Sequence, residues 1–206
     1  MKVLDLFSGL KGWSDPFKEA GHDVFTIDNN PALNPDMALD IGDVKAVLAA
    51  VPWKPDLILA SPPCTSFSIA GVSHHWTKDG QPKSAVAVEG VRLVRATVDL
   101  IHLLGPRWWI VENPVGRLRT LYLLPLDWER RTVTYCKFGE RRQKRTDLWG
   151  EFPEDLNLPW ACAPRMTCHE ASPRGAVGKG TQGMETAISA KIPRRLAEMV
   201  MRSLPA

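Results

Sequence analysis

The sequence predicts an α/β fold: a mostly parallel sheet with an antiparallel edge strand and helices on both faces. Two observations carry this prediction. Short apolar runs alternate with amphipathic segments through the first half of the chain, as in parallel strands joined by helical crossovers. Two late apolar runs follow each other without a helical segment between them, which favours an antiparallel pair at the edge. With 206 residues, the chain is long enough for one domain with a substantial core.

Hydrophobic periodicity and turn residues place the individual elements. Apolar runs predict strands at residues 2–7, 22–30, 56–61, 107–113, 130–138 and 145–152. Helices are predicted at residues 13–21, 43–51 and 82–105, and one last helix is predicted to carry on one face Ile188, Ile192, Leu196 and Val200. The polar segment 65–82 is a long loop, and such loops in compact domains are usually functional or mobile.

Composition divides the chain into a main domain, residues 1–151 and 185–206, and a small insert, residues 152–184. The insert is rich in proline, glycine, cysteine and arginine and has little periodicity. We therefore expect it to be irregular.

The composition also excludes several classes of protein. Hydrophobic residues make up 44% of the chain and charged residues 24%, which argues against disorder. No apolar run reaches transmembrane length, and Asp5 stands where a signal peptide would stay apolar. Four cysteines are too few and too scattered for a disulfide framework, so we expect reduced thiols in a cytoplasmic protein.

The net charge of +3 conceals an asymmetry, because residues 1–60 carry −4 and residues 61–206 carry +7. The segment 137–145, "KFGERRQKR", holds five bases and one acid. A basic run can be a solvated face. It also suits a surface that faces a polyanion while the first third of the chain binds something else.

Parallel sheets bind ligands beyond the carboxyl ends of their strands. This rule gathers the residues that follow each predicted strand into one crevice, although they are distant in sequence: Phe7–Gly12, Asp28, Asp40, Ser61–Ser68 and Glu112–Pro114.

Three motifs at these strand ends carry chemically useful groups. "DLFSGLKGW" has glycines that let the backbone approach a ligand, and Asp28 after the next strand suits a pair of ribose hydroxyls. "PPCTSFS" fixes Cys64 behind two prolines, where a thiol can serve as a nucleophile. In "WWIVENPVG", Glu112 ends an apolar strand, where a carboxylate is costly without a partner or a task. Taken singly, each motif also has a purely structural explanation. The first fits a tight turn, the second an inert cysteine, and the third an acid that caps a turn.

Taken in order, "DLFSG", the acid at residue 28, "SPPC…FS" and "ENP" resemble the cytosine-C5 DNA methyltransferases. "FSIAGVSHHW" and "RWWIVENPVGRLR" resemble small phage-type members. The resemblance covers most of residues 1–150 and, more faintly, the final helix. It implies a Rossmann-like, S-adenosylmethionine-dependent methyltransferase acting on a cytosine flipped out of double-stranded DNA.

The resemblance also implies roles for individual residues. Cys64 would add to C6 of cytosine, Glu112 would protonate or hydrogen-bond N3, and Arg145 would be the third catalytic residue. The cofactor would be S-adenosyl-L-methionine, held by Asp5, Phe7, Ser8, Gly9, Gly12, Asp28, Asn29, Asp40, Ile41, Ser61 and Pro62. The residues expected to bind DNA are Pro63, Ser66, Phe67, Ser68, His74, His75, Trp76, Lys78, Asn113, Gln143, Arg174 and Lys179.

The sequence departs from the family pattern at two positions. The family's Gln-x-Arg-x-Arg strand is matched by Gln143 and Arg145, but Asp147 replaces the second arginine. Either Arg141 or Arg142 substitutes, or the register differs by one residue. An Asp147→Arg change is expected to raise activity if the missing arginine limits catalysis. Lys11 stands where the family often has glycine.

The insert is short for target recognition, so we expect a short or relaxed target sequence. Cys162, Cys168 and His169, with Cys136 as a fourth ligand, could form a zinc site, but their spacing is not a standard zinc pattern, and no metal is predicted. We expect a monomer in a bacterial or phage-infected cell. The alternatives are the same chemistry on RNA, a DNA- and cofactor-binding protein that has lost catalysis, and a thiol-dependent enzyme acting on free nucleotides.

Overall fold

A computed structural model describes residues 1–159, 161–162, 167–170 and 186–205 of the chain. The strands are β1 (Lys2–Leu6), β2 (Asp23–Asp28), β3 (Met37–Ala38), β4 (Leu57–Ala60), β5 (Trp108–Pro114), β6 (Glu129–Thr134) and β7 (Arg145–Glu151). The α-helices are α1 (Ser14–Glu19), α2 (Val44–Ala50), α3 (Val72–His75), α4 (Ala85–Leu104), α5 (Thr186–Ala190) and α6 (Arg194–Ser203). Short 3₁₀ helices are η1 (Pro31–Leu33), η2 (Arg117–Thr120) and η3 (Tyr135–Phe138).

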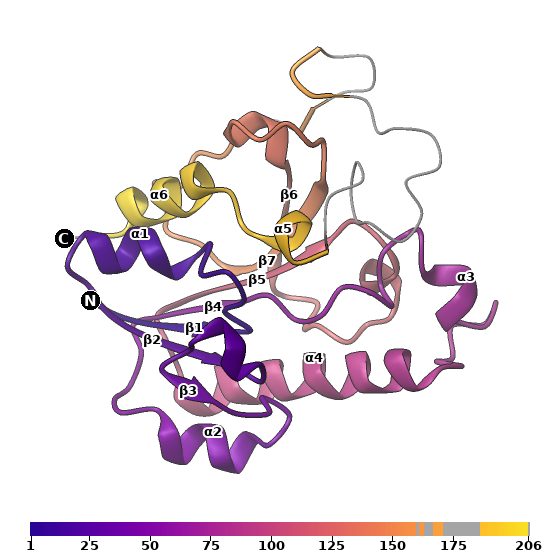
Figure 1. Cartoon of the computed structure of the whole chain (residues 1–206), viewed down its shortest axis with the longest axis horizontal. Coiled ribbons are helices and arrows are strands. Elements are labelled where there is room, and N and C mark those ends of the chain that lie inside the picture. The colour runs from indigo at the N-terminus through magenta and orange to yellow at the C-terminus, as the bar shows by residue number, and fades with distance from the viewer. Residues whose placement is uncertain (160, 163–166, 171–185, 206) are drawn as a thin grey trace.

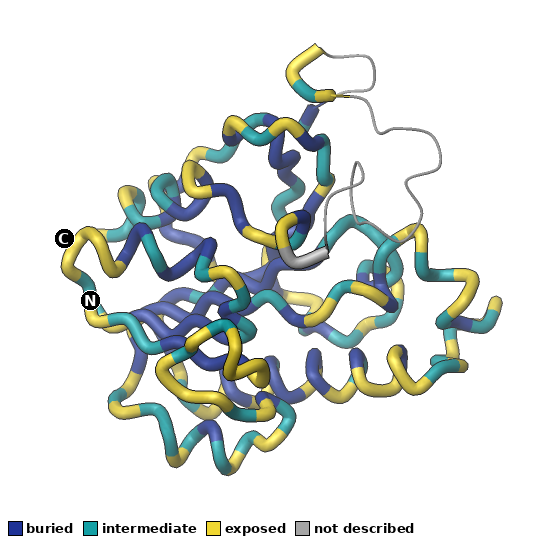
Figure 2. Tube along the Cα trace, in the orientation of Figure 1, coloured by how far each residue is buried: buried dark blue, intermediate teal, exposed yellow. Residues whose placement is uncertain are grey.

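The sheet lies between two layers of helices, with α1 and α6 on one face and α2 and α4 on the other (Figure 1). Each face has its own apolar core. Val47 of α2 and Val94 of α4 belong to one cluster, and Phe17 of α1 and Leu196 of α6 belong to the other. The buried residues run along the central strands and the inner sides of the helices (Figure 2). This confirms the predicted α/β architecture.

The strand order is β3-β2-β1-β4-β5-β7-β6. β1 to β5 pair in parallel, and β7 is antiparallel to both β5 and β6. The two late strands therefore pair antiparallel at one edge, as predicted. The strand that runs against the others is β7, second from that edge, and the outermost strand is β6.

The strand order reverses between β1 and β4, since the chain builds outward from this pair in both directions. Such a switch point leaves a crevice at the carboxyl ends of the two strands. Here the ends carry the segments Phe7–Gly12 and Ser61–Ser68, so the fold places two of the predicted motifs side by side.

Helix α4 begins and ends on recognisable signals. The hydroxyl oxygen of Ser84 accepts a hydrogen bond from the Ala87 amide at 3.1 Å, which caps the amino end. Gly105 follows the helix with a φ of 54°, a left-handed conformation that suits glycine.

The single final helix predicted from sequence is wrong. Residues 186–190 form α5, and α6 begins at Arg194 after a break. Pro193, with a ψ of 132°, separates the two because proline disfavours helical geometry in the preceding residue and has no N–H to donate. Ile188, predicted on the buried face, is 44% exposed.

Within the described part of the chain, none of the helices combines the length and the apolarity needed to cross a membrane.

Candidate active site

A cavity of about 140 Å³ opens at the carboxyl ends of β1, β4 and β5. The structure brings predicted residues from three separate motifs to its wall: Phe7, Ser8, Gly9, Gly12, Ser61, Pro62, Pro63, Cys64 and Glu112. Leu10 falls within the predicted range Phe7–Gly12. Sequence reasoning did not predict the remaining lining residues: Trp13, Leu33, Lys144, Ala190, Lys191 and Ile192.

The loop after β1 has an unusual backbone. Phe7 and Lys11 both have left-handed φ angles, of 59° and 55°. A left-handed conformation costs a residue with a Cβ about 1–2 kcal/mol, which gives a physical reason why glycine suits position 11. The Asp28 carboxylate stabilises the loop by accepting the Gly9 amide at 2.9 Å, and its other oxygen accepts the Asn30 amide. Asn29 is exposed beside this contact.

The segment between α5 and α6 closes one side of the cavity. A Cβ on Gly12 would lie 2.6 Å from the backbone nitrogen of Ile192, so a larger residue would push this segment away. The Arg142 guanidinium donates to the Lys191 carbonyl at 2.7 Å and ties the segment to the turn before β7. The first and the last described parts of the chain therefore share one binding wall.

Asp5, predicted to bind the cofactor, is fully buried in β1 and does not line the cavity. Burial raises the pKa of this carboxyl to about 7, the neighbouring Ser14 opposes the rise, and the nearby Asp28 adds to it. Asp5 therefore belongs to the buried part of β1 and not to the cavity wall.

The loop that carries Cys64 is fixed from several sides. The Asn113 amide donates to the Pro62 carbonyl at 2.9 Å, and the amides of Phe67 and Ser68 both donate to the Cys64 carbonyl at 3.0 Å. Gly116 allows the chain after β5 to come close, because a Cβ there would lie 2.1 Å from the Phe67 carbonyl oxygen. "ENP" and "PPC" thus form one packed unit.

Four residues predicted to contact DNA are buried, and one of them is Asn113 in β5. Ser66, Phe67 and Trp76 are at most 4% exposed. The Trp76 indole donates to the Ser66 carbonyl at 2.7 Å, and its ring lies 5.7 Å from that of Phe67. Large aromatic surfaces gain most by burial, so these residues hold the Cys64 loop and are not free for surface contact.

The rest of the 65–82 segment presents polar groups outward. His74 and Lys78 are exposed, and Ser68 is half-buried. His75 is also half-buried, and its Nδ1 lies 2.7 Å from the hydroxyl of Ser84, the residue that caps α4. Arg174 and Lys179 lie outside the described residues.

Glu112 is 3% exposed and has two partners. The Tyr135 hydroxyl donates to its Oε1 at 2.8 Å, and the Lys144 ammonium contacts the same oxygen at 3.1 Å. Burial and the neighbouring Glu112 carboxylate raise the Tyr135 pKa well above its ordinary value, so this phenol keeps its proton and donates. The hydrogen bonds found among the described residues all go to Oε1 and leave Oε2 without a donor, and Glu112 lines the cavity.

Lys144 was missed from the sequence, whereas Arg145 was predicted to be catalytic. Successive side chains along a strand point to opposite faces. Glu112 pairs with Leu148, so Lys144, four residues before Leu148, lies on the Glu112 face and Arg145 on the other. Arg145 is exposed and does not line the cavity, and Gln143 is half-buried. The structure therefore places Lys144, and not Arg145, beside Glu112.

Burial raises the pKa of the Cys64 thiol, the Lys144 ammonium lowers it, and the Glu112 carboxylate raises it. The thiol is thus largely protonated at neutral pH, and Lys144 is the group that favours the thiolate.

Asp147 lies in the interior, and its charge is paired. It is completely buried, and its two oxygens accept hydrogen bonds from Arg119 of η2, each at 2.5 Å, while the Thr132 hydroxyl donates at 2.7 Å. Arg141 is paired with Glu170 and Arg142 with Glu140, so neither replaces the missing arginine at the cavity. Because Arg142 and Lys144 turn inward, the run 137–145 is less basic on its surface than its composition predicts.

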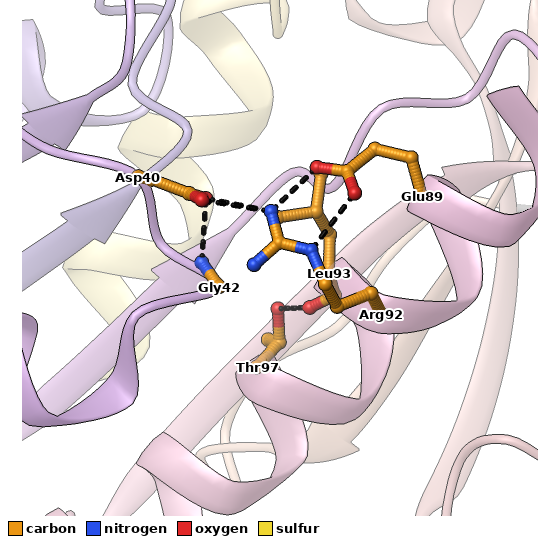
Figure 3. Close-up of polar contacts among 6 residues, drawn as sticks. All are labelled: Asp40, Gly42, Glu89, Arg92, Leu93 and Thr97. Atoms are coloured by element: carbon orange, nitrogen blue, oxygen red, sulfur yellow. Dashed lines mark hydrogen bonds and ion pairs between the residues drawn. The ribbon is translucent and has the colours of Figure 1, made fainter. Parts of the chain in front are cut away.

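Asp40 and Ile41, predicted beside adenine, lie further along the same edge. The Asp40 carboxylate accepts the Gly42 amide at 2.8 Å and pairs with Arg92 of α4, which also pairs with Glu89 (Figure 3). Ile41 is buried. A larger cavity of about 780 Å³ begins next to them, on the α4 face of the sheet, and reaches Trp76 and Gln81 in the 65–82 segment.

Comparison with known proteins finds a matching family model and similar proteins. Residues 1–122 match the family model of C-5 cytosine-specific DNA methylases. A probable DNA (cytosine-5)-methyltransferase of Frog virus 3 is 30% identical over 175 residues, which are 82% of this chain and 78% of the viral protein. The Type II methyltransferase M.HgiGI of Herpetosiphon aurantiacus is 31% identical over 124 residues, which are 55% of this chain and 90% of that one.

Solved structures show the same fold at lower identity. The Entamoeba histolytica methyltransferase EhMeth aligns with 77% of this chain at a TM-score of 0.54 and 15% identity. The alignment covers 56% of the Entamoeba chain, so the present chain spans about half the length of that solved relative.

Proposed function

The chain belongs to the C-5 cytosine-specific DNA methylase family, and from that membership we propose how its residues perform the reaction. The activity is transfer of a methyl group to C5 of cytosine in DNA. We infer that the substrate is double-stranded DNA, that S-adenosyl-L-methionine is the methyl donor, and that Cys64 is the nucleophile. One observation supports this most: Cys64, Glu112 and the Phe7–Gly12 loop line a single cavity.

The residues around the cavity suit such a cofactor. Each oxygen of Asp28 accepts one backbone amide and has a further lone pair, which suits the ribose hydroxyls. The lining of the cavity includes Ser8 and Gly12 but not Asp28, so a bound nucleoside would extend beyond it. We therefore place the methionine end against Ser8 and Gly12 and the sugar toward Asp28. When bound, S-adenosylmethionine would supply the methyl group that is transferred to C5.

Cys64 and Glu112 act at two different atoms of the pyrimidine ring, Cys64 at C6 and Glu112 at N3. The Cys64 thiol loses its proton to solvent, and its sulfur forms a bond with C6. The C5–C6 electron pair moves toward C5 and N3. N3 takes up a proton, and the resulting N–H group donates a hydrogen bond to Oε2 of Glu112. C5 is thereby made nucleophilic and takes the methyl group. Loss of the C5 proton, the N3 proton and the Cys64–C6 bond restores the ring.

Lys144 and Tyr135 are positioning residues in this scheme. Both hold Oε1 of Glu112, which turns Oε2 toward the cavity. The Lys144 charge also stabilises the Cys64 thiolate. Duplex DNA hides C6, so the base must leave the stack at a cost of a few kcal/mol. We assign DNA contact to the exposed His74, Lys78 and Arg145, and we expect a monomer acting in the cytoplasm.

The test is incubation of the protein with labelled S-adenosylmethionine and unmethylated duplex DNA, followed by nucleoside mass spectrometry. The wild type should give 5-methylcytosine. Cys64→Ser should give none while its unfolding midpoint stays at the wild-type value. RNA of the same sequence is the control substrate. Methylation by Cys64→Ser, or methylation of RNA alone, would overturn the proposal.

A further inference from the structure

Four metal-ligating side chains meet near the end of β6, and none of them lines the cavity. They are Cys136 in η3, Cys162, Cys168 and His169. One ligand atom from each residue lies within 4.8 Å of the corresponding atoms of the other three. We propose that this cluster binds one Zn²⁺ ion as a closed Cys₃His structural site.

The distances between the ligand atoms fit a tetrahedral ion. Zinc bonds of about 2.3 Å to sulfur and 2.0–2.1 Å to nitrogen place tetrahedral ligand atoms roughly 3.5–3.8 Å apart. The sulfur of Cys168 lies 3.3 Å from that of Cys162 and 3.7 Å from that of Cys136. Nδ1 of His169 lies 3.5 Å from the Cys162 sulfur and 3.8 Å from the Cys168 sulfur.

The ligand chemistry selects the metal. Three thiolates and an imidazole form a soft donor set, which favours zinc over magnesium or calcium. Four protein ligands complete a tetrahedral shell and leave no position for a substrate, as in structural rather than catalytic zinc sites. The sulfur atoms of Cys162 and Cys168 lie 3.3 Å apart, which is far longer than a disulfide bond of about 2.05 Å.

The surroundings support a site that joins two parts of the chain. The amide of Cys162 donates to the Thr134 hydroxyl at 2.8 Å, and Glu170, next to His169, forms an ion pair with Arg141 at 2.7 Å. The ion would therefore anchor the described part of the insert to the end of β6. Such anchoring is useful because residues 167–170 are exposed or half-buried, so apolar burial contributes little to holding them in place.

The sequence did not predict this site because its spacing is irregular. Cys162, Cys168 and His169 are close along the chain, but the fourth ligand, Cys136, comes from η3, 26 residues before Cys162. The fold supplies it by turning sharply after β6. Cys136 also follows Tyr135, whose hydroxyl holds Glu112, so the ion would stabilise the strand end that supports the candidate active site.

The first measurement is the metal content of the purified full-length protein by inductively coupled plasma mass spectrometry. We expect about one zinc per chain. Cys168→Ser should lose most of the zinc, and because Cys168 is exposed, this change removes a ligand without opening a cavity in the core. Cys64→Ser is the matched control, since it removes a thiol outside the cluster and should keep the full zinc content.

A second measurement does not depend on any variant folding. Wild-type protein stripped with a chelator should lose thermal stability and regain it with Zn²⁺. Titration with Co²⁺ should give the visible absorption bands of tetrahedral, thiolate-ligated cobalt. Full zinc loading in Cys168→Ser, or no zinc and no cobalt bands in a wild type with four titratable thiols, would overturn the proposal. Loss of two titratable thiols to a disulfide would overturn it as well.

Discussion

The buried pair between Lys144 and Glu112 gives the sharpest prediction of stability. The two side chains are 8% and 4% exposed and lie 3.1 Å apart. At an effective dielectric constant of about 20, charges at this distance attract by about 5 kcal/mol. In Lys144→Met the lysine partner is gone and the Glu112 charge stays buried beside Tyr135 alone. Breaking a buried pair in this way costs about 3–5 kcal/mol of unfolding free energy.

The assay is urea unfolding at pH 7 of Lys144→Met, Glu112→Gln and the double variant. Lys144→Met should be destabilised by about 3–5 kcal/mol. The double variant should recover much of that loss because no unpaired charge remains. Lys144→Arg, which keeps the charge, is the control and should stay close to the wild type. A loss below about 1 kcal/mol in Lys144→Met, typical of an exposed pair, or a strictly additive double variant, would refute this reasoning.

Three further variants test the loop and the core. Lys11→Gly should raise the unfolding free energy by about 0.5–1 kcal/mol, because a left-handed φ of 55° strains lysine. The gain is limited because glycine has extra freedom in the unfolded chain. A variant that is less stable in urea than the wild type would contradict this. Asp5→Asn should stabilise more at pH 8 than at pH 4, because the raised folded pKa of about 7 means that the wild type loses stability as the pH rises from about 4 to 7. The slope is about 1.4 kcal/mol per pH unit, and equal thermal shifts at both pH values would refute it. Asp147→Arg should lose about 3–5 kcal/mol of unfolding free energy, because it buries a second guanidinium beside Arg119. An unchanged urea midpoint with higher methylation would instead support the expectation from sequence that this change raises activity.

The sequence predicted the features that depend on local pattern. Alternating apolar runs gave the α/β sheet, and the rule that parallel strands end at one edge placed Cys64 and Glu112 together. Cys64 follows β4 and Glu112 lies near the end of β5, and proline marks the end of both apolar runs. No knowledge of strand pairing was needed to find them.

The features that failed depend on pairing between distant segments. The side chain that faces Glu112 is set by the register of β7 against β5, which neither strand encodes alone. Arg119 neutralises Asp147 across 28 residues, and only the folded η2 brings them together. From the sequence, Trp76 was expected to lie in an exposed loop. In the structure it directly follows the short helix α3, and its indole packs against Phe67.

The close packing of Gly12 against Ile192 has a consequence for synthesis of the protein. The binding wall is made of one strip at residues 7–12 and another near residue 192, so the ribosome delivers the first well before the second. A nascent chain that already contains β1, β2 and β4 therefore still has a cavity that is open on one side. The wall is complete only after the later strip has been synthesised.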